Sequence, residues 1–130
     1  MKAGEIMHRP VIAATRTTSA RDVAELLLMG EFSGVPIAEQ DGTVVGVVTE
    51  LDLIRVMRVD VSLETTAAED IMASRVTSVD VDAPVEQVME LLDTENIIRV
   101  PVTEKGKLVG LISRADVLKA MIQPKFLRFG

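Results

Sequence analysis

Residues Gly110–Asp116 read GLISRAD, and residues Gly46–Asp52 read GVVTELD in the same places. Each stretch runs from a glycine through two apolar residues to a Thr or Ser, which is followed three residues later by Asp. Thr or Ser followed at that spacing by an acidic residue is a helix-capping pattern, so each stretch predicts a strand that passes directly into a helix. The recurrence of the whole stretch indicates that the chain contains a duplication.

The duplication extends outward over most of the chain. Toward the N-terminus, a shift of 65 positions carries Ile6–Met7 onto Ile71–Met72 and Val35–Pro36 onto Val100–Pro101 without a gap. The shift becomes 64 after a turn that is one residue shorter in the second copy. A register this long, with its single gap in a turn, indicates two copies of one structural unit.

Each copy predicts the order β-α-β-β-α, which gives a mixed fold of the α/β (α+β) class. A small strand is expected near Val11 and near Val76, followed by a helix with apolar residues at helical spacing. Two strands joined by a Gly-containing turn come next, and a last helix begins at Thr49 or Ser113. The expected elements after the small strand are a helix from Ser19, strands at 35–38 and 43–48 and a helix at 49–57, and then a helix from about Pro84, strands at 100–103 and 107–112 and a helix at 113–121.

The expected organisation is a first repeat at 1–60, a linker at 61–66, a second repeat at 67–123 and a C-terminal tail at 124–130. The tail carries Phe126, Leu127 and Phe129 and falls outside the repeat. It docks on its own module, exchanges with a neighbour, or marks where a longer protein was cut, and the residues do not choose among these.

Composition excludes several classes of partner. The chain has 14 basic and 20 acidic residues, a net charge of −6, and neither Trp nor Tyr. An acidic surface without aromatic platforms argues against nucleic-acid binding. No apolar run reaches membrane-spanning length, and the N-terminus lacks the apolar core of a signal peptide. We therefore expect a cytoplasmic protein with no membrane partner.

Catalysis is not expected. The chain has no cysteine and one histidine, His8, so thiol chemistry and multi-histidine metal sites are excluded. His8 precedes Arg9-Pro10 in a predicted loop and is expected to be simply exposed. No pair of carboxylates is placed in a way that favours acid–base chemistry over a solvated helix face. The sequence predicts no metal site and no required cofactor.

The repeated motifs resemble those of the CBS domain family. The family pattern is Asp-Ile-Met, then an apolar-Val-Pro-Val strand, then Gly-apolar-apolar-Thr/Ser-x-x-Asp. The sequence shows it at Asp70–Met72, Arg99–Val102 and Gly110–Asp116, and, with Glu in place of the first Asp, at Glu5–Met7, Gly34–Ile37 and Gly46–Asp52. The resemblance covers residues 3 to 122. It implies two repeats packed face to face about a pseudo-two-fold axis, with two clefts that bind AMP, ADP, ATP, S-adenosylmethionine or a related molecule, and a homodimer of such pairs.

The Thr/Ser-x-x-Asp elements are the central candidates for binding. Amide groups and the dipole at a helix N-terminus favour an anion, and Thr49 or Ser113 would add a hydroxyl beside a phosphate. By resemblance, Asp52 and Asp116 accept hydrogen bonds from ribose hydroxyls. The same spacing is equally a structural cap, and both roles are compatible. The predicted ligand-binding residues are Ile12, Ala13, Gly34, Val35, Pro36, Thr49 and Asp52 in the first copy, and Thr77, Ser78, Arg99, Val100, Pro101, Ser113, Arg114 and Asp116 in the second.

The two sites are expected to differ in charge. Arg114 follows Ser113 and Arg99 begins the nearby strand, so cations are available for phosphate. Glu50 follows Thr49 and would oppose a phosphate there. The second copy's site is therefore predicted to prefer a phosphorylated ligand, and the first to be empty or to take a less negative one. For Arg114, a solvated surface charge is an equal alternative.

These expectations describe a non-catalytic regulatory module that senses an adenosine-containing ligand, including the nucleotides of energy sensing, and signals to an unidentified effector protein. The ligand would stabilise one relative orientation of the two halves. The alternative is a ligand-free dimerisation or protein-interaction module with degenerate clefts. In that case Met29, Met57, Met89 and Met121 would offer adaptable apolar contacts for packing in the core or at a dimer interface.

Overall fold

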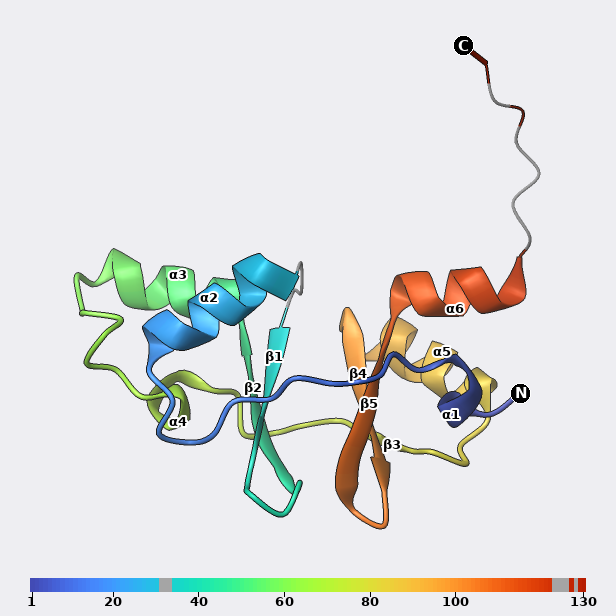
Figure 1. The fold of residues 1–130 in the computed structure, drawn as a ribbon, viewed down its shortest axis with the longest axis horizontal. Helices are drawn as coiled ribbons and strands as arrows, with labels where there is room; N and C mark the ends of the chain where they lie inside the picture. Colours follow the sequence, from blue (N-terminus) through green and yellow to red (C-terminus); the bar gives the residue numbers. More distant parts are fainter. Residues whose placement is uncertain (31–33, 123–126, 128) are drawn as a thin grey trace.

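The chain folds into two similar halves, each with a sheet and covering helices (Figure 1). The computed structural model describes residues 1–30, 34–122, 127 and 129–130. The first half contains α2 (Ala20–Gly30), β1 (Gly34–Ala38), β2 (Val44–Thr49) and α3 (Glu50–Arg58). The second contains β3 (Val79–Asp80), α5 (Val85–Thr94), β4 (Arg99–Glu104), β5 (Lys107–Ser113) and α6 (Arg114–Met121). Two short helices, α1 (Ala3–Ile6) and α4 (Ala68–Ile71), complete this α+β fold.

Each half is organised around an antiparallel hairpin. β1 pairs with β2, and β4 pairs with β5. In the second half β3 adds a parallel strand through Val79 and Val102, whereas in the first half the corresponding pairing is a single parallel bridge between Ala14 and Ile37. The small strand predicted near Val11 and Val76 therefore lies three residues later. Ala14 and Val79 take this place because their side chains are buried in the two cores.

The helices begin where the sequence predicts. The Asp22 amide donates to Ser19 Oγ at 3.1 Å just before α2, and α3 and α6 start directly after Thr49 and Ser113. α2 and α5 bury apolar residues four positions apart on the face that covers the sheet. Each half consequently has a core of its own.

The short helices α1 and α4 are exchanged between the halves (Figure 1). α1 precedes the first repeat, yet Ala3 is fully buried in the core of the second half, and its amide donates to the Ala83 carbonyl at 2.8 Å. α4 packs in the opposite sense. Ala68 is fully buried in the first half, and its amide donates to the Thr18 carbonyl at 2.7 Å. The sequence did not predict this exchange.

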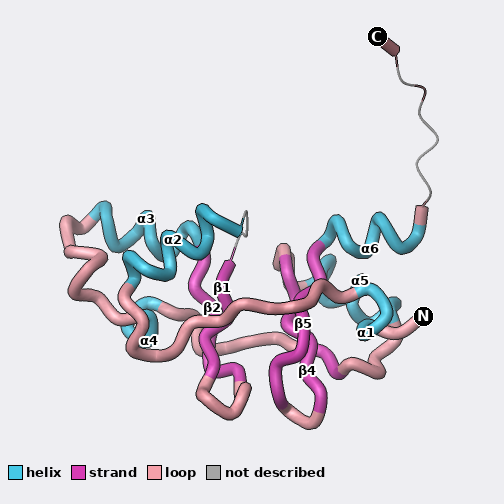
Figure 2. The backbone as a smooth tube through the Cα atoms, in the orientation of Figure 1, coloured by secondary structure: helices cyan, strands magenta, loops and turns pink. Residues whose placement is uncertain are grey.

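Two extended segments carry the chain from each exchanged helix back to its own repeat. The first crossing segment (residues 7–14) and the second crossing segment (residues 72–79) both lie between the halves in Figure 2. Each is fixed to the hairpin that it passes. The His8 amide donates to the Leu111 carbonyl at 2.8 Å, and the Ala73 amide donates to the Val47 carbonyl at 2.9 Å. The halves are therefore connected by backbone pairing as well as by side-chain packing.

Gly46 and Gly110 make room for the crossing segments. A Cβ at Gly110 would lie 2.5 Å from Met7 Sδ and 3.0 Å from the His8 carbonyl oxygen. A Cβ at Gly46 would collide with Met72 in the same way and would lie 3.0 Å from the Ala73 carbonyl oxygen. These two glycines therefore serve the close packing of each crossing segment on the hairpin of the other repeat. The Ile-Met and glycine motifs of opposite repeats meet in space.

The tips of the two hairpins also touch. The Leu108 amide donates to the Gly42 carbonyl at 2.8 Å, and Lys107 Nζ lies 2.9 Å from Asp41 Oδ2. The hydrogen bond from the Lys107 ammonium holds the pKa of Asp41 well below its usual range, with help from the Thr43 amide. This exposed ion pair is the charged part of the contact between the tips.

The C-terminal tail is only partly described. Residues 123–126 and 128, including Phe126, lie outside the described part of the chain. The three alternatives for the tail therefore stay predictions.

Gly110→Ala is expected to lower the free energy of unfolding by about 1–3 kcal/mol, because the added methyl group overpacks the space held by Met7 and the His8 backbone. Gly46→Ala should act alike through Met72. Urea denaturation measures both variants, and Ser74→Ala on the exposed part of a crossing segment serves as a control. Wild-type stability in both glycine variants would contradict the close approach.

Lys107→Met is expected to raise the pKa of Asp41 toward the ordinary carboxylate value of about 3.9, because the main lowering influence is removed. Since the pKa is lowered in the folded state, the pair contributes stability at pH values above that ordinary value, and loses it as the pH falls below. Carboxyl-detected NMR titration follows the change. Lys105→Met, in the same turn, should leave Asp41 as it is in the wild type.

Candidate functional site

The two Thr/Ser-x-x-Asp elements form the same capping box. The Thr49 amide donates to Asp52 Oδ2 at 2.8 Å, and the Asp52 amide donates to Thr49 Oγ1 at 3.4 Å. In the second repeat the Ser113 amide donates to Asp116 Oδ2 at 2.7 Å, and the return bond to Ser113 Oγ measures 3.2 Å. The capping interpretation is confirmed at both places. In each box the cap uses Oδ2 of the aspartate, so any further role of that residue falls to Oδ1.

The Oδ1 atoms of the two aspartates have different neighbours. Asp116 Oδ1 lies 2.5 Å from His8 Nε2. Asp52 Oδ1 has Arg55 at 3.9 Å, an exposed side chain one turn along the same helix. His8 is exposed, as expected, with 61% of its side chain accessible, but it also contacts a carboxylate that is only 5% exposed, which the sequence did not predict.

A cavity of about 480 Å³ lies between the halves, at the N-terminus of α3 and beside the second crossing segment. We call this region the first cleft. By the correspondence of the two repeats, we use the name second cleft for the region around Ser113 and Asp116 at the start of α6, beside the first crossing segment. The cavity is lined by Gly34, Pro36, Val47, Thr49, Glu50, Leu51, Ala73, Arg75, Val76, Thr77, Asn96, Ile97, Ile98, Arg99, Pro101 and Leu111. Its volume lies within the range of small-molecule sites.

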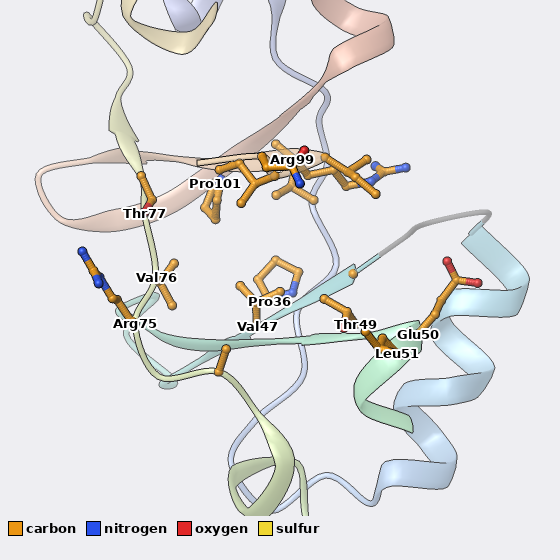
Figure 3. A pocket seen from close by; sticks show the side chains of 16 residues that line it. Pro36, Val47, Thr49, Glu50, Leu51, Arg75, Val76, Thr77, Arg99 and Pro101 are labelled. Carbon is orange, nitrogen blue, oxygen red and sulfur yellow. The ribbon is translucent and has the colours of Figure 1, made fainter. Parts of the chain in front are cut away.

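The lining comes from both repeats, as Figure 3 shows. Pro36 and Val47 lie on one side of the cavity, and Arg99 and Pro101 lie on the other. Apolar surface from two separate sheets is thus placed face to face. A flat, largely apolar group would fit between these walls.

Charged groups stand around this apolar centre. Arg75 and Glu50 lie at opposite ends of the cavity in Figure 3, and Arg99 lies on the wall formed by the second repeat. The amides at the N-terminus of α3 lie beside Thr49. Two cations, one anion and a helix N-terminus therefore surround the first cleft. Its electrostatic environment is more favourable to a negatively charged ligand than the prediction from Glu50 alone.

Six of the predicted site residues line this cavity: Gly34, Pro36, Thr49, Thr77, Arg99 and Pro101. Arg99 lies in a different place from the one expected. Its charge was predicted to serve the second cleft together with Arg114, but Arg99 lines the first cleft. The prediction grouped Arg99 with the motif of its own repeat, whereas the cavity takes residues from both repeats.

Other predicted residues lie outside the cavity lining. Val35 and Val100 are buried in the separate cores, because neighbouring residues of a strand point to opposite faces. Their side chains cannot contact a ligand between the halves. Asp52 and Asp116 are held in their caps, and Ser113 is buried with Asp116. Ile12, Ala13 and Ser78 lie on the crossing segments, where Ile12 and Ser78 are exposed.

Arg114 is exposed but not simply solvated. Its Nε donates to the Ile97 carbonyl at 3.1 Å, and a terminal nitrogen lies 3.4 Å from Asn96 Oδ1. These bonds tie the N-terminus of α6 to the loop before β4. The predicted phosphate role of Arg114 would require this arrangement to change.

Other residues line the cavity although they were not predicted as site residues. They include Val47, Leu51, Ala73, Arg75, Val76, Asn96, Ile97, Ile98 and Leu111. Arg75 could have been predicted from the sequence, because it lies two positions before Thr77, which was a predicted site residue. The loop at 96–98 had none, since its place beside the other repeat depends on how the halves pack.

In the described ranges, the side chains form no group of three or more His, Cys, Asp or Glu residues suited to a metal ion. Nor does any described helix combine the length and the apolar character needed to cross a membrane.

Comparison with known proteins gives consistent results. The family model described as "CBS domain" matches residues 3–59 and 68–123. The protein YlbB of Bacillus subtilis is 32% identical over 117 residues, which are 89% of this chain and 79% of YlbB. Inosine-5'-monophosphate dehydrogenase of Methanocaldococcus jannaschii is 23% identical over 98% of this chain. The chain spans only 25% of that enzyme, and 62% of the protein MK0525 of Methanopyrus kandleri.

Solved structures share the fold. The CBS domain pair of protein MJ0100, in complex with 5'-methylthioadenosine and S-adenosyl-L-methionine, has a TM-score of 0.81 and 25% identity over 92% of this chain and 94% of that one. CBSX2 in complex with AMP has a TM-score of 0.80 and 26% identity over 92% and 94% of the two chains. Hypoxic Response Protein I, with two coordinated zinc ions, has a TM-score of 0.86 at 21% identity over 94% and 100%, which shows the fold alone.

Proposed function

The chain belongs to the CBS domain family, and on this premise we propose that it is a non-catalytic regulatory module that binds an adenosine-containing ligand in the first cleft. One observation carries the proposal: a cavity of about 480 Å³ is lined by both repeats and opens beside the capped N-terminus of α3. The neighbours support it, because MJ0100 holds 5'-methylthioadenosine and S-adenosyl-L-methionine, and CBSX2 holds AMP.

The chemistry of the cavity suggests how such a ligand lies. An adenine ring would fit between the apolar walls of Pro36, Val47 and Pro101. By the family resemblance, the ribose would be bound by Asp52, which caps α3 behind Thr49 and lies outside the cavity lining itself. A phosphate or another polar tail would meet the α3 amides at Thr49, with Arg99 across the cavity. AMP, ADP, ATP and S-adenosylmethionine all share the adenosine that this arrangement recognises.

Ligand binding would change the relative orientation of the two halves, and that orientation would be the signal. Pro36 and Thr49 belong to the first repeat, and Thr77 and Arg99 belong to the second, so a bound molecule contacts both. It would stabilise the relative orientation in which both sets of contacts form. An effector protein or an attached domain would respond to that orientation.

Asp52→Ala is expected to weaken adenosine-ligand binding at least tenfold, because it removes a charged acceptor for the ribose hydroxyls. Isothermal titration with AMP, ADP, ATP and S-adenosylmethionine measures the affinity, and circular dichroism checks the fold. Asp22→Ala is the matched control, because Asp22 follows its capping residue by three positions at the start of α2, a helix that contributes no residue to the cavity, whereas Thr49, Glu50 and Leu51 around Asp52 all line it.

Binding that is unchanged in a folded Asp52→Ala protein would remove Asp52 from the site. A wild-type protein that binds none of the four compounds would contradict the proposal itself.

A second candidate function, self-association, is favoured by apolar side chains on the outside of the helices. Leu28 and Met29 at the end of α2 are each 82% exposed, and Ile54 on α3 and Leu118 on α6 are about half exposed. Met57, Met89 and Met121 are also exposed, so these four helix methionines do not pack in the core of the chain. Such surfaces are typical of interfaces.

We expect the wild-type protein to form a homodimer through these helices, and a charge placed among them to dissociate it. Sedimentation equilibrium of Ile54→Glu and Leu118→Glu measures the mass, and Glu69→Lys, at an exposed position of α4 away from these apolar residues, is the charge-change control. A monomeric wild-type protein at all concentrations would overturn this candidate.

A further inference from the structure

The repeat places different side chains at one equivalent backbone position. His8 in the first crossing segment corresponds to Ala73 in the second. The two are held alike: the His8 amide donates to the Leu111 carbonyl at 2.8 Å, and the Ala73 amide donates to the Val47 carbonyl at 2.9 Å. The same backbone geometry therefore brings an imidazole to the second cleft and only a methyl group to the first.

The His8 imidazole contacts Asp116 Oδ1, the carboxylate oxygen that the capping box does not use. His8 Nε2 lies 2.5 Å from Asp116 Oδ1, while Oδ2 accepts from the Ser113 amide at 2.7 Å and the Ser113 hydroxyl at 2.9 Å. Both carboxylate oxygens are engaged, and the residue is 5% exposed. Any molecule that needs Asp116 Oδ1 must first displace His8.

The first cleft is open at the corresponding place. Ala73 itself lines the cavity. The cation paired with Asp52 Oδ1 is Arg55, at 3.9 Å on the exposed side of α3 rather than on the crossing segment. The residue at the place of His8 therefore carries no group that could bond to Asp52 Oδ1.

We propose that His8 blocks the second cleft from within, so that the module takes ligand in the first cleft and admits it to the second only when His8 leaves Asp116. The inference rests on the proposed function and names the regulation of its site. A ribose hydroxyl would gain one hydrogen bond to Asp116 Oδ1 only after the bond from His8 is broken and the imidazole has moved, so its net gain is small.

The test uses AMP as the probe and exchanges the two side chains. Isothermal titration gives the number of AMP molecules per chain, and the amide NMR signals of Glu50 and Arg114 report which helix N-terminus is occupied. Wild type should bind one AMP, with shifts at Glu50. His8→Ala should bind two, the second at least tenfold more tightly than any second binding in wild type, with new shifts at Arg114.

Ala73→His supplies the mirror variant, because it places an imidazole opposite Asp52. We expect it to weaken binding in the first cleft about tenfold. Arg9→Ala, on the residue next to His8, controls for general loosening of the crossing segment and should behave like wild type.

The outcomes separate the two proposals. One AMP in both wild type and His8→Ala, without shifts at Arg114, overturns the block and leaves the proposed function standing. No AMP in wild type, but binding at Arg114 in His8→Ala, overturns the first-cleft proposal and supports the block. Two AMP molecules in wild type, or none in any variant, overturns the block.

Discussion

The reciprocal exchange of α1 and α4 is the constraint on which the rest of the structure depends. Each short helix fills the core of the opposite half, and its methionine packs where a glycine in the neighbouring strand leaves room. Met7 meets Gly110, and Met72 meets Gly46. Interiors are packed at crystal-like density, so this fit fixes the halves relative to each other more strictly than a flat contact would.

The candidate site is a product of that exchange. Because the crossing segments must return from the exchanged helices, each passes between the hairpins and becomes a wall of a cleft that belongs to neither repeat alone. A difference of one side chain on these segments is then enough to distinguish the clefts. Ala73 leaves space beside Asp52, and His8 fills the corresponding place beside Asp116.

The sequence predicted what depends on local pattern. Capping signals located the starts of α3 and α6, alternation and turns located the hairpins, and the repeat indicated two equal units. It could not predict the exchange, because the apolar pattern of α1 is the same whichever core it enters. The cavity that Arg99 lines and the partner of His8 follow from that long-range choice, so the sequence could not predict them. The side chain of Val35 lies in the core, because neighbouring strand residues face opposite sides, so its predicted contact with a ligand could be made only through its backbone.

The exchange also sets an order for the growing chain on the ribosome. α1 is synthesised before both repeats, but its hydrogen-bond partner Ala83 belongs to the second repeat, and the core that receives it includes Val117. α1 can therefore reach its native place only after Val117 has emerged. The first half, by contrast, completes its core as soon as α4 is available. Synthesis would thus produce a finished N-terminal half long before the final closure, which a long-range contact makes the slow step.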